Sequence, residues 1–241
     1  GIRNSLLGYN SGGLITTGAS NTFVGKDAGA ANTTASSNTF IGERAGLANT
    51  TGDESVAVGQ FSYAANTTGA DNVAVGRAAL SVNTTASNNV AIGRAALGTN
   101  TTGTSNVAIG SFALDANTTG SQNVGVGKNA LGSNTTGQYN TSLGHGSLAV
   151  NTTADYNTAL GYTALVANTT GTINTAVGAY AGDAITTGGS NTVVGGYALT
   201  ATTTGDYNTA MGVSALGTNT TADNNTAVGY DSLKYNTTGA S

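Results

Sequence analysis

A glycine recurs at every seventeenth position from Gly8 to Gly229, with no insertion or deletion. This interval divides the chain of 241 residues into fourteen copies of one unit, which reads Asn-Thr/Val-Ala-Val/Ile-Gly-x-x-Ala-Leu-x-x-Asn-Thr-Thr-Gly/Ala-x-x. A short unit repeated at a fixed period is typical of a solenoid, in which each copy forms one coil and stacks on the next. We therefore expect a single all-β domain over residues 1–241, with fourteen coils of equal length.

The composition excludes several classes of protein. Charged residues make up 7% of the chain, whereas soluble proteins average about 25%, and the abundant small and polar residues recur periodically rather than as a flexible tract. The absence of cysteine excludes disulfides and thiolate metal sites. A net charge of −4 argues against a nucleic-acid-binding protein. No apolar run approaches the length of a membrane span, so we expect no membrane insertion in this segment.

The first part of each unit predicts a short strand. Counting the leading Asn as position 0, position 3 is apolar in every copy, position 1 is mostly Thr or Val, and position 2 is usually Ala, as in Val90, Ala91 and Ile92. Successive side chains of a strand point to opposite faces. We expect positions 1 and 3 to face the interior, and the small residues at position 2 to allow close packing against neighbouring subunits.

The second part of each unit predicts another short strand. The pair Ala-Leu recurs at positions 7 and 8, with Leu in nine of the fourteen units, and would supply the opposing inward side chain. The glycine at position 4 suits a tight turn with unusual backbone angles, and Asn-Thr-Thr-Gly is a cluster of turn-forming residues. Two strands and two turns per coil predict a β-roll of two parallel sheets. A three-sided β-helix or a calcium-binding nonapeptide roll fits the pattern less well.

The strand motif resembles that of a known family of repeats. Asn89 to Gly93 and Asn106 to Gly110 both read Asn-Val-Ala-Ile-Gly, which is similar to the head repeats of YadA-like trimeric autotransporter adhesins. The arrays at Asn157 to Gly161 and Asn225 to Gly229 also resemble repeats of phage tail fibres. The resemblance covers the whole chain and implies a left-handed parallel β-roll that assembles as a homotrimer, in an extracellular or virion fibre. The units here are longer than the adhesin repeat.

Both ends of the chain consist of ordinary repeat units. Solenoids normally need terminal caps for solubility, so we expect the chain to be a segment of a longer fibre protein. An uncapped solenoid could also stack end to end into a filament.

Two polar ladders follow from the repeat. A Thr-Thr pair occurs in all fourteen units, and one member of each pair would be exposed because adjacent strand residues point to opposite faces. We expect these hydroxyls to bond the local backbone, with ice binding as the alternative. Asn leads thirteen units, with Ser55 as the exception, and precedes Thr-Thr in eleven. Stacked amides are expected to bond from coil to coil; Asn32-Thr33-Thr34 and its repeats also match the glycosylation motif.

No group of residues forms a catalytic or metal-binding pattern. His145, the sole histidine, has no second histidine or nearby carboxylate in the sequence, so we interpret it as a solvated surface residue. The acidic pair Asp53 and Glu54 is interpreted as a solvated turn rather than a cation site. We therefore expect no catalytic residues, no cofactor and no metal.

The two ends of the chain differ in charge and aromatic content. Residues 129–241 contain Lys234, five aspartates and eight of the ten tyrosines, whereas residues 1–128 carry balanced charges. Exposed tyrosines offer an apolar face with a polar tip to a partner protein or a glycan. The candidate partner-binding residues are Tyr139, Tyr156, Tyr162, Tyr180, Tyr197, Tyr207 and Tyr230.

These observations together predict a non-enzymatic extracellular fibre segment of the trimeric adhesin head type. Such a segment would attach a surface to a host protein or glycan through many weak contacts. The alternatives are the shaft or receptor-binding segment of a phage tail fibre, an ice- or carbohydrate-binding solenoid, and a self-polymerising filament.

Overall fold

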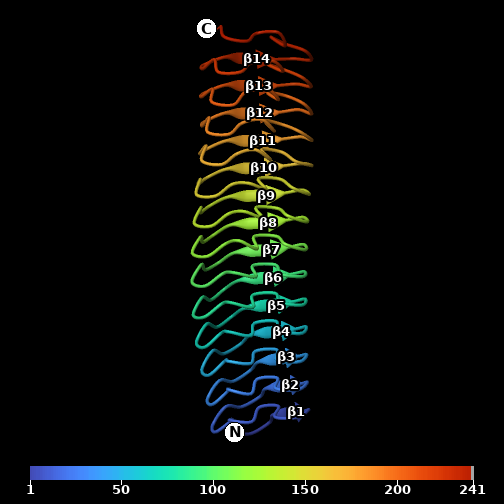
Figure 1. Ribbon diagram of the computed structural model, residues 1–241, viewed down its shortest axis with the longest axis vertical. Coiled ribbons are helices and arrows are strands. Elements are labelled where there is room, and N and C mark those ends of the chain that lie inside the picture. The colour runs from blue at the N-terminus through green and yellow to red at the C-terminus, as the bar shows by residue number, and fades with distance from the viewer. Residues whose placement is uncertain (240–241) are drawn as a thin grey trace. The chain divides into compact units, whose positions relative to one another are not determined.

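The computed structural model describes residues 1–239, and its regular secondary structure consists of fourteen β-strands of three residues each. Each strand occupies positions 1 to 3 of one repeat unit (Figure 1). The strands are β1 (Ser5–Leu7), β2 (Thr22–Val24), β3 (Thr39–Ile41), β4 (Val56–Val58), β5 (Val73–Val75), β6 (Val90–Ile92), β7 (Val107–Ile109), β8 (Val124–Val126), β9 (Thr141–Leu143), β10 (Thr158–Leu160), β11 (Thr175–Val177), β12 (Thr192–Val194), β13 (Thr209–Met211) and β14 (Thr226–Val228). The predicted all-β solenoid is confirmed.

The chain forms two compact units, Gly1–Gln122 and Asn123–Ser241. In the first unit β1 to β7 pair in sequence order, and in the second β8 to β14 do the same. All pairs are parallel, and the register advances by one repeat at each step, as in Thr22 opposite Thr39 and Thr158 opposite Thr175. Within each unit, therefore, every residue lies beside the residue at the same position of the next coil.

The strand faces are the reverse of the sequence prediction. Ala91 at position 2 is fully buried, whereas Ile92 at position 3 is 38% exposed, and the other strands of the interior coils repeat this pattern. The small residues therefore line the core, and the Val, Ile and Thr side chains lie on the outer face. The reason is size: so short a coil encloses too little space for two rows of branched side chains in addition to the leucines.

The segment around Ala-Leu is a run of turns rather than a second strand. Ala95 and Leu97 have φ angles of 54° and 49°, in the left-handed region, which a strand does not tolerate. Its backbone still bonds from coil to coil, since the amide of Leu97 donates to the carbonyl of Ala113 at 3.0 Å. The expected second sheet of strands does not form among the described residues; the coils stack there as turns.

The inward orientation of the leucines is confirmed. Eight of the nine leucines at position 8 are fully buried, and Leu233 in the last coil is half-exposed. The buried ones are Leu80, Leu97, Leu114, Leu131, Leu148, Leu165, Leu199 and Leu216. They are the main apolar contribution to a narrow core.

Coils without this leucine fill the same space from another position. Phe23 and Phe40 at position 2 are fully buried opposite Gly29 and Gly46 at position 8, and their rings stack with centroids 4.9 Å apart. In another coil, Ile185 is fully buried beside Gly182. Each of these coils therefore replaces the missing leucine with one large apolar side chain from a different position.

Tyr63 takes the leucine position in one coil of the first unit and is fully buried. Its hydroxyl donates to the carbonyl of Gly69 and accepts from the side-chain amide of Asn72, both at 2.7 Å. Burial raises the pKa of Tyr63 to about 12. These hydrogen bonds satisfy the hydroxyl group, while the ring fills the apolar space that leucine occupies in other coils.

The glycine at position 4 that defines the repeat has a steric cause. Gly42 has a φ of 133°, and a Cβ on it would lie 2.7 Å from the carbonyl carbon and oxygen of Gly59 in the next coil. A side chain there would be strained by the backbone and would also push neighbouring coils apart. The prediction of a turn that requires glycine is confirmed.

The two asparagine ladders close each coil and join it to its neighbours. The side-chain amides of Asn38 and Asn49 both donate to the carbonyl of Gly52, at 3.0 and 2.9 Å. Between coils, the backbone amide of Asn38 donates to Oδ1 of Asn21 at 3.0 Å. The predicted structural role of the stacked amides is thus confirmed, and both ladders are fully buried over most coils.

Candidate functional site

Burial of the ladder asparagines bears on the glycosylation motif. Asn32, Asn49 and Asn83, which begin Asn-Thr-Thr sequences, are fully buried, and their side-chain nitrogens donate to the carbonyl three residues later. A glycan attached to such a nitrogen would have no space inside the coil. The folded chain therefore does not present these positions as glycosylation sites.

The two threonines of each pair have different surroundings. The hydroxyl of the first bonds the backbone of the next coil, as Thr33 Oγ1 donates to the carbonyl of Thr50 at 3.1 Å. The second threonine is exposed, as at Thr34, Thr153 and Thr187. The expected backbone bonding applies to one member of the pair, and the other forms an exposed row of hydroxyls within each unit.

All seven candidate tyrosines lie in the second unit, and two of them form a stacked pair at position 16. The rings of Tyr139 and Tyr156 are 4.9 Å apart and within 3° of parallel. Ile173 occupies the same position in the next coil and is 59% exposed. Three consecutive coils therefore carry exposed apolar side chains at a turn position that many other coils fill with Ser, Asn or Asp.

A second aromatic row joins residues that the sequence pattern kept apart. His145 stacks on Tyr162 with centroids 5.4 Å apart, Tyr162 meets Tyr180 edge-on at 5.3 Å, and Tyr180 stacks on Tyr197 at 5.0 Å. His145 is on the surface as expected, but it belongs to this row rather than standing alone. Tyr162 and Tyr180 occupy positions 5 and 6 of neighbouring coils, and only the stacking of the coils brings their rings together.

Stacking decides what these rings present to a partner. A ring that is parallel to its neighbour at about 5 Å has that face covered, and only its other face, its edge and its hydroxyl remain for a partner. Tyr207 and Tyr230 make no ring contact with another aromatic residue in the described part of the chain. The flat apolar faces expected of all seven tyrosines are therefore best available at these two.

Position 16 has a strained backbone for such side chains. Tyr139, Tyr156, Ile173 and Tyr207 have φ angles between 57° and 60°. The left-handed region is tolerated by Asn and Asp, whose side chains bond locally, and is unfavourable for bulky or β-branched residues. These residues gain little burial in return, because all four are exposed. Other coils have the same conformation at this position, as at Ser20, Glu54 and Gln122, so the repeat imposes it on whichever residue is present.

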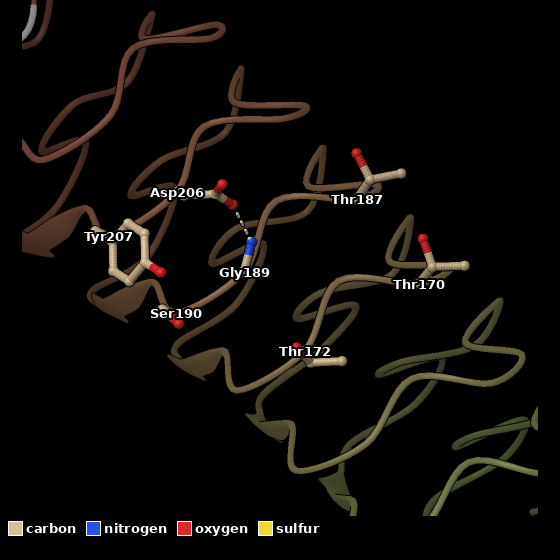
Figure 2. Close-up of a pocket in the computed structure, with 7 residues that line it drawn as sticks. All are labelled: Thr170, Thr172, Thr187, Gly189, Ser190, Asp206 and Tyr207. Atoms are coloured by element: carbon tan, nitrogen blue, oxygen red, sulfur yellow. Dashed lines mark hydrogen bonds between the residues drawn. The ribbon is translucent and has the colours of Figure 1, made fainter.

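Tyr207 borders a hollow of about 230 Å³ in the second unit (Figure 2). Thr170, Thr172 and Thr187 line it with hydroxyls from two coils, and Ser190 and Asp206 complete it. The backbone amide of Gly189 donates to Oδ1 of Asp206 at 2.6 Å. Figure 2 shows the ring of Tyr207 on one side of Gly189 and Thr187 on the other. Of these residues, only Tyr207 was a candidate from the sequence.

Gly189 is the lining residue that departs from the repeat. It is the only glycine at position 15, where the other units carry Ala, Ser, Thr, Gln or Asp. Its backbone lies outside the left-handed region, so the glycine is not required by the turn. The signal that could have found the site is therefore a single departure from the repeat next to an aspartate and a tyrosine.

Aspartates at position 15 accept hydrogen bonds from the preceding coil. Oδ1 of Asp53 accepts the backbone amide of Ser36 in the preceding coil at 2.7 Å. Oδ1 of Asp223 accepts the amide of Asp206 in the same way, at 2.8 Å. These carboxylates extend the hydrogen bonding between coils. Among residues 1–239, no three His, Asp or Glu side chains gather as a metal site would require.

No helix with the length and apolar character of a membrane span occurs in residues 1–239. Comparisons of the chain with protein-family models, with curated proteins and with solved structures found no match.

Proposed function

We propose that the chain is a non-enzymatic structural and adhesive segment of an extracellular fibre, of the trimeric adhesin head type. Three parallel copies associate through the outer faces of their strands. The observation that carries the proposal is the apolar outer face of the strands, whose side chains the repeat pattern had assigned to the interior.

This face is most apolar in the first unit. Both outward positions are aliphatic on four consecutive strands, β4 to β7. The residues are Val56, Val58, Val73, Val75, Val90, Ile92, Val107 and Ile109. A strand face that meets only water is normally polar, and a contiguous apolar patch on a soluble protein marks an interaction surface.

The shape of the face favours identical partners. The side chains repeat at the same position of every coil, so a second copy aligned in parallel meets the same row at the same spacing. Identical faces arranged about a rotation axis give a closed cyclic assembly. The resemblance to adhesin head repeats supports three copies. Because the core of a single chain is narrow and buries little apolar surface, burial of the strand faces between copies would stabilise the assembly.

The mass of the chain in solution tests this proposal. We expect light scattering after size-exclusion chromatography to give three times the chain mass of 23.4 kDa. The double variant Ile92→Lys and Ile109→Lys places charges on neighbouring strands and is expected to give the monomer mass. Its matched control is Thr102→Lys with Thr119→Lys, which places the same charges on exposed turns of the same coils. A monomeric wild type would overturn the proposal. So would a trimer that persists in the double variant Ile92→Lys and Ile109→Lys.

Ice binding is a second candidate, favoured by the exposed second threonine of each pair. Because the first threonine hydroxyl is bonded internally, the second is free to order water along each unit. Thermal hysteresis and shaping of ice crystals are the measurements. Absence of both at millimolar protein would remove this candidate.

A further inference from the structure

We infer that the hollow beside Gly189 is a binding subsite for one neutral sugar residue. This inference rests on the adhesive part of the proposed function and names its ligand class. It does not depend on the number of chains in the fibre. Four properties of the hollow carry it: its polar lining, its aromatic edge, its charge and its size.

The lining offers threonine hydroxyls and one carboxylate oxygen that are available to hydrogen-bond a ligand. Thr170, Thr172 and Thr187 are exposed at the hollow, and each hydroxyl can both donate and accept. Asp206 uses Oδ1 for the amide of Gly189, which fixes the carboxylate and leaves Oδ2 as an acceptor. Sugar hydroxyls need such a mixture of fixed acceptors and adaptable partners.

Tyr207 lies at the border of the polar hollow. Its ring is 64% exposed, and the coils on either side carry Ser190 and Asn224 at its position, so no ring covers its faces. A sugar in the hollow can hydrogen-bond the tyrosine hydroxyl, and the exposed ring beside the hollow can pack against the apolar C–H face of the glycan where it leaves the hollow.

The charge of the hollow selects against acidic ligands. No Lys or Arg lines it, Asp206 lies in it, and Asp223 bonds the backbone amide of Asp206 from the following coil. A sialic acid, a uronic acid, a sulfate or a phosphate would meet these carboxylates without a compensating cation. The geometry therefore favours a neutral hexose or an N-acetylhexosamine.

The size of the hollow limits the ligand to one sugar residue. Its volume of about 230 Å³ is below the ~300–1,000 Å³ typical of pockets that enclose a whole drug-sized ligand. One residue at the end or on the side of a glycan chain would occupy it, and the remainder of the chain would extend into solvent. Repetition of such weak contacts over the copies in a fibre would provide avidity.

The probes are the methyl glycosides of glucose, galactose, mannose and N-acetylglucosamine, with methyl glucuronide as the acidic comparison. Saturation-transfer difference NMR and amide shift titrations would measure binding to the full chain. At least one neutral glycoside is expected to bind with a Kd on the order of 1 mM, shifting the amide signals of Gly189 and Tyr207. Binding of the glucuronide alone, or of none of the five, would overturn the inference.

Three variants locate the binding. Gly189→Ser introduces the side chain that Ser36, Ser87 and Ser121 carry at this position, and its Cβ would lie 3.0 Å from the carbonyl oxygen of Thr172, so it narrows the hollow. Tyr207→Ser introduces the residue present as Ser190 one coil earlier, and Asp206→Asn removes the charge. The first two are expected to weaken binding at least tenfold, and the third severalfold.

The matched control is Gln122→Ser, which introduces serine at the same turn position away from the hollow and is expected to bind as the wild type does. Unchanged affinity in both Gly189→Ser and Tyr207→Ser would show that the sugar binds elsewhere and would overturn the inference. The mass of the assembly is measured separately, so a failure to bind sugar and a failure to form a trimer are distinguishable.

Discussion

The ring of Phe40 occupies the space that a side chain on Gly46 would take, with its Cδ2 and Cε2 atoms 2.4 Å from the position of a Cβ there. Most coils have the reverse arrangement, as in Ala91 and Leu97. Gly46 has a φ of 59° and Leu97 one of 49°, so the backbone of Gly46 already has the conformation that leucine adopts at this position. Positions 2 and 8 of a coil therefore compensate for each other in size, since a large side chain at one accompanies a small residue at the other.

A double-mutant cycle at Phe40 and Gly46 should show strong coupling. Phe40→Ala is expected to cost about 3–5 kcal/mol because it leaves a cavity, and Gly46→Leu is expected to destabilise by overpacking against the ring. The double variant recreates the common coil. It should lie within about 2 kcal/mol of the wild type, the remainder reflecting the lost stacking on Phe23. Urea unfolding midpoints of the four proteins measure this, and additive effects of the two changes would contradict it.

Replacing one buried ladder asparagine should lower the free energy of unfolding. The side-chain nitrogen of Asn157 donates to the carbonyl of Gly171 at 2.8 Å, and its Oδ1 accepts the amide of Asn174 at 2.9 Å. Asn157→Ala leaves the amide of Asn174 without this acceptor in a buried site, so we expect a loss of about 2–4 kcal/mol in unfolding experiments.

Asn157→Ser is the matched comparison, because Ser55 occupies this position naturally and its hydroxyl accepts the amide of Asn72 at 3.2 Å. The serine variant is expected to retain part of the stability lost in the alanine variant. Equal losses for the two would show that the hydrogen bond to the next coil is not the source of the effect.

The stability of the second unit should respond to the charge of Asp183. Partial burial raises the pKa of Asp183 above its ordinary value of 3.8, so the folded chain holds this proton more tightly than the unfolded chain. The contribution of the protonated carboxyl to the stability of the fold is complete below about pH 4, and it is lost as the pH rises through the raised pKa. At pH 7 the ionised carboxylate therefore destabilises the fold, and its Oδ1 is buried without a hydrogen-bond partner.

Asp183→Asn should raise the thermal midpoint at pH 7 by no more than a few degrees, since the group is partly solvated. At pH 3 the variant and the wild type should unfold at similar temperatures. Asp115→Asn in the first unit should behave in the same direction, because burial raises the pKa of Asp115 as well. A lower midpoint at pH 7 for both variants would contradict the assignment.

Ile173 should be replaceable with a gain in stability. It is exposed and has a φ of 60°, which is unfavourable for a β-branched residue. Asn224 and Asn88 occupy the same position in other coils, so Ile173→Asn is expected to stabilise the fold by about 1 kcal/mol. Ile173→Val keeps the branching and should give no such gain in denaturant unfolding. A destabilising Asn substitution would indicate that the isoleucine side chain makes a stabilising contact.

The fixed period of the glycines was sufficient to predict a parallel solenoid, an invariant glycine turn, inward leucines and bonded asparagine ladders. Each of these depends on interactions that repeat identically from coil to coil, so the pattern of the sequence carries them directly. Gly42 shows why: the same steric contact with the next glycine recurs at each step of the first unit.

The tertiary structure alone decided which face of each strand is inside. Alternation at Val90, Ala91 and Ile92 is compatible with either orientation, and hydrophobicity favoured the wrong one; the small volume of the coil admits Ala91 and excludes its neighbours. Stacking of the coils also brought His145 beside the tyrosines and formed the hollow at Gly189 from three consecutive coils. Such sites depend on which departures from the repeat become neighbours across coils, and the consensus unit does not contain that information.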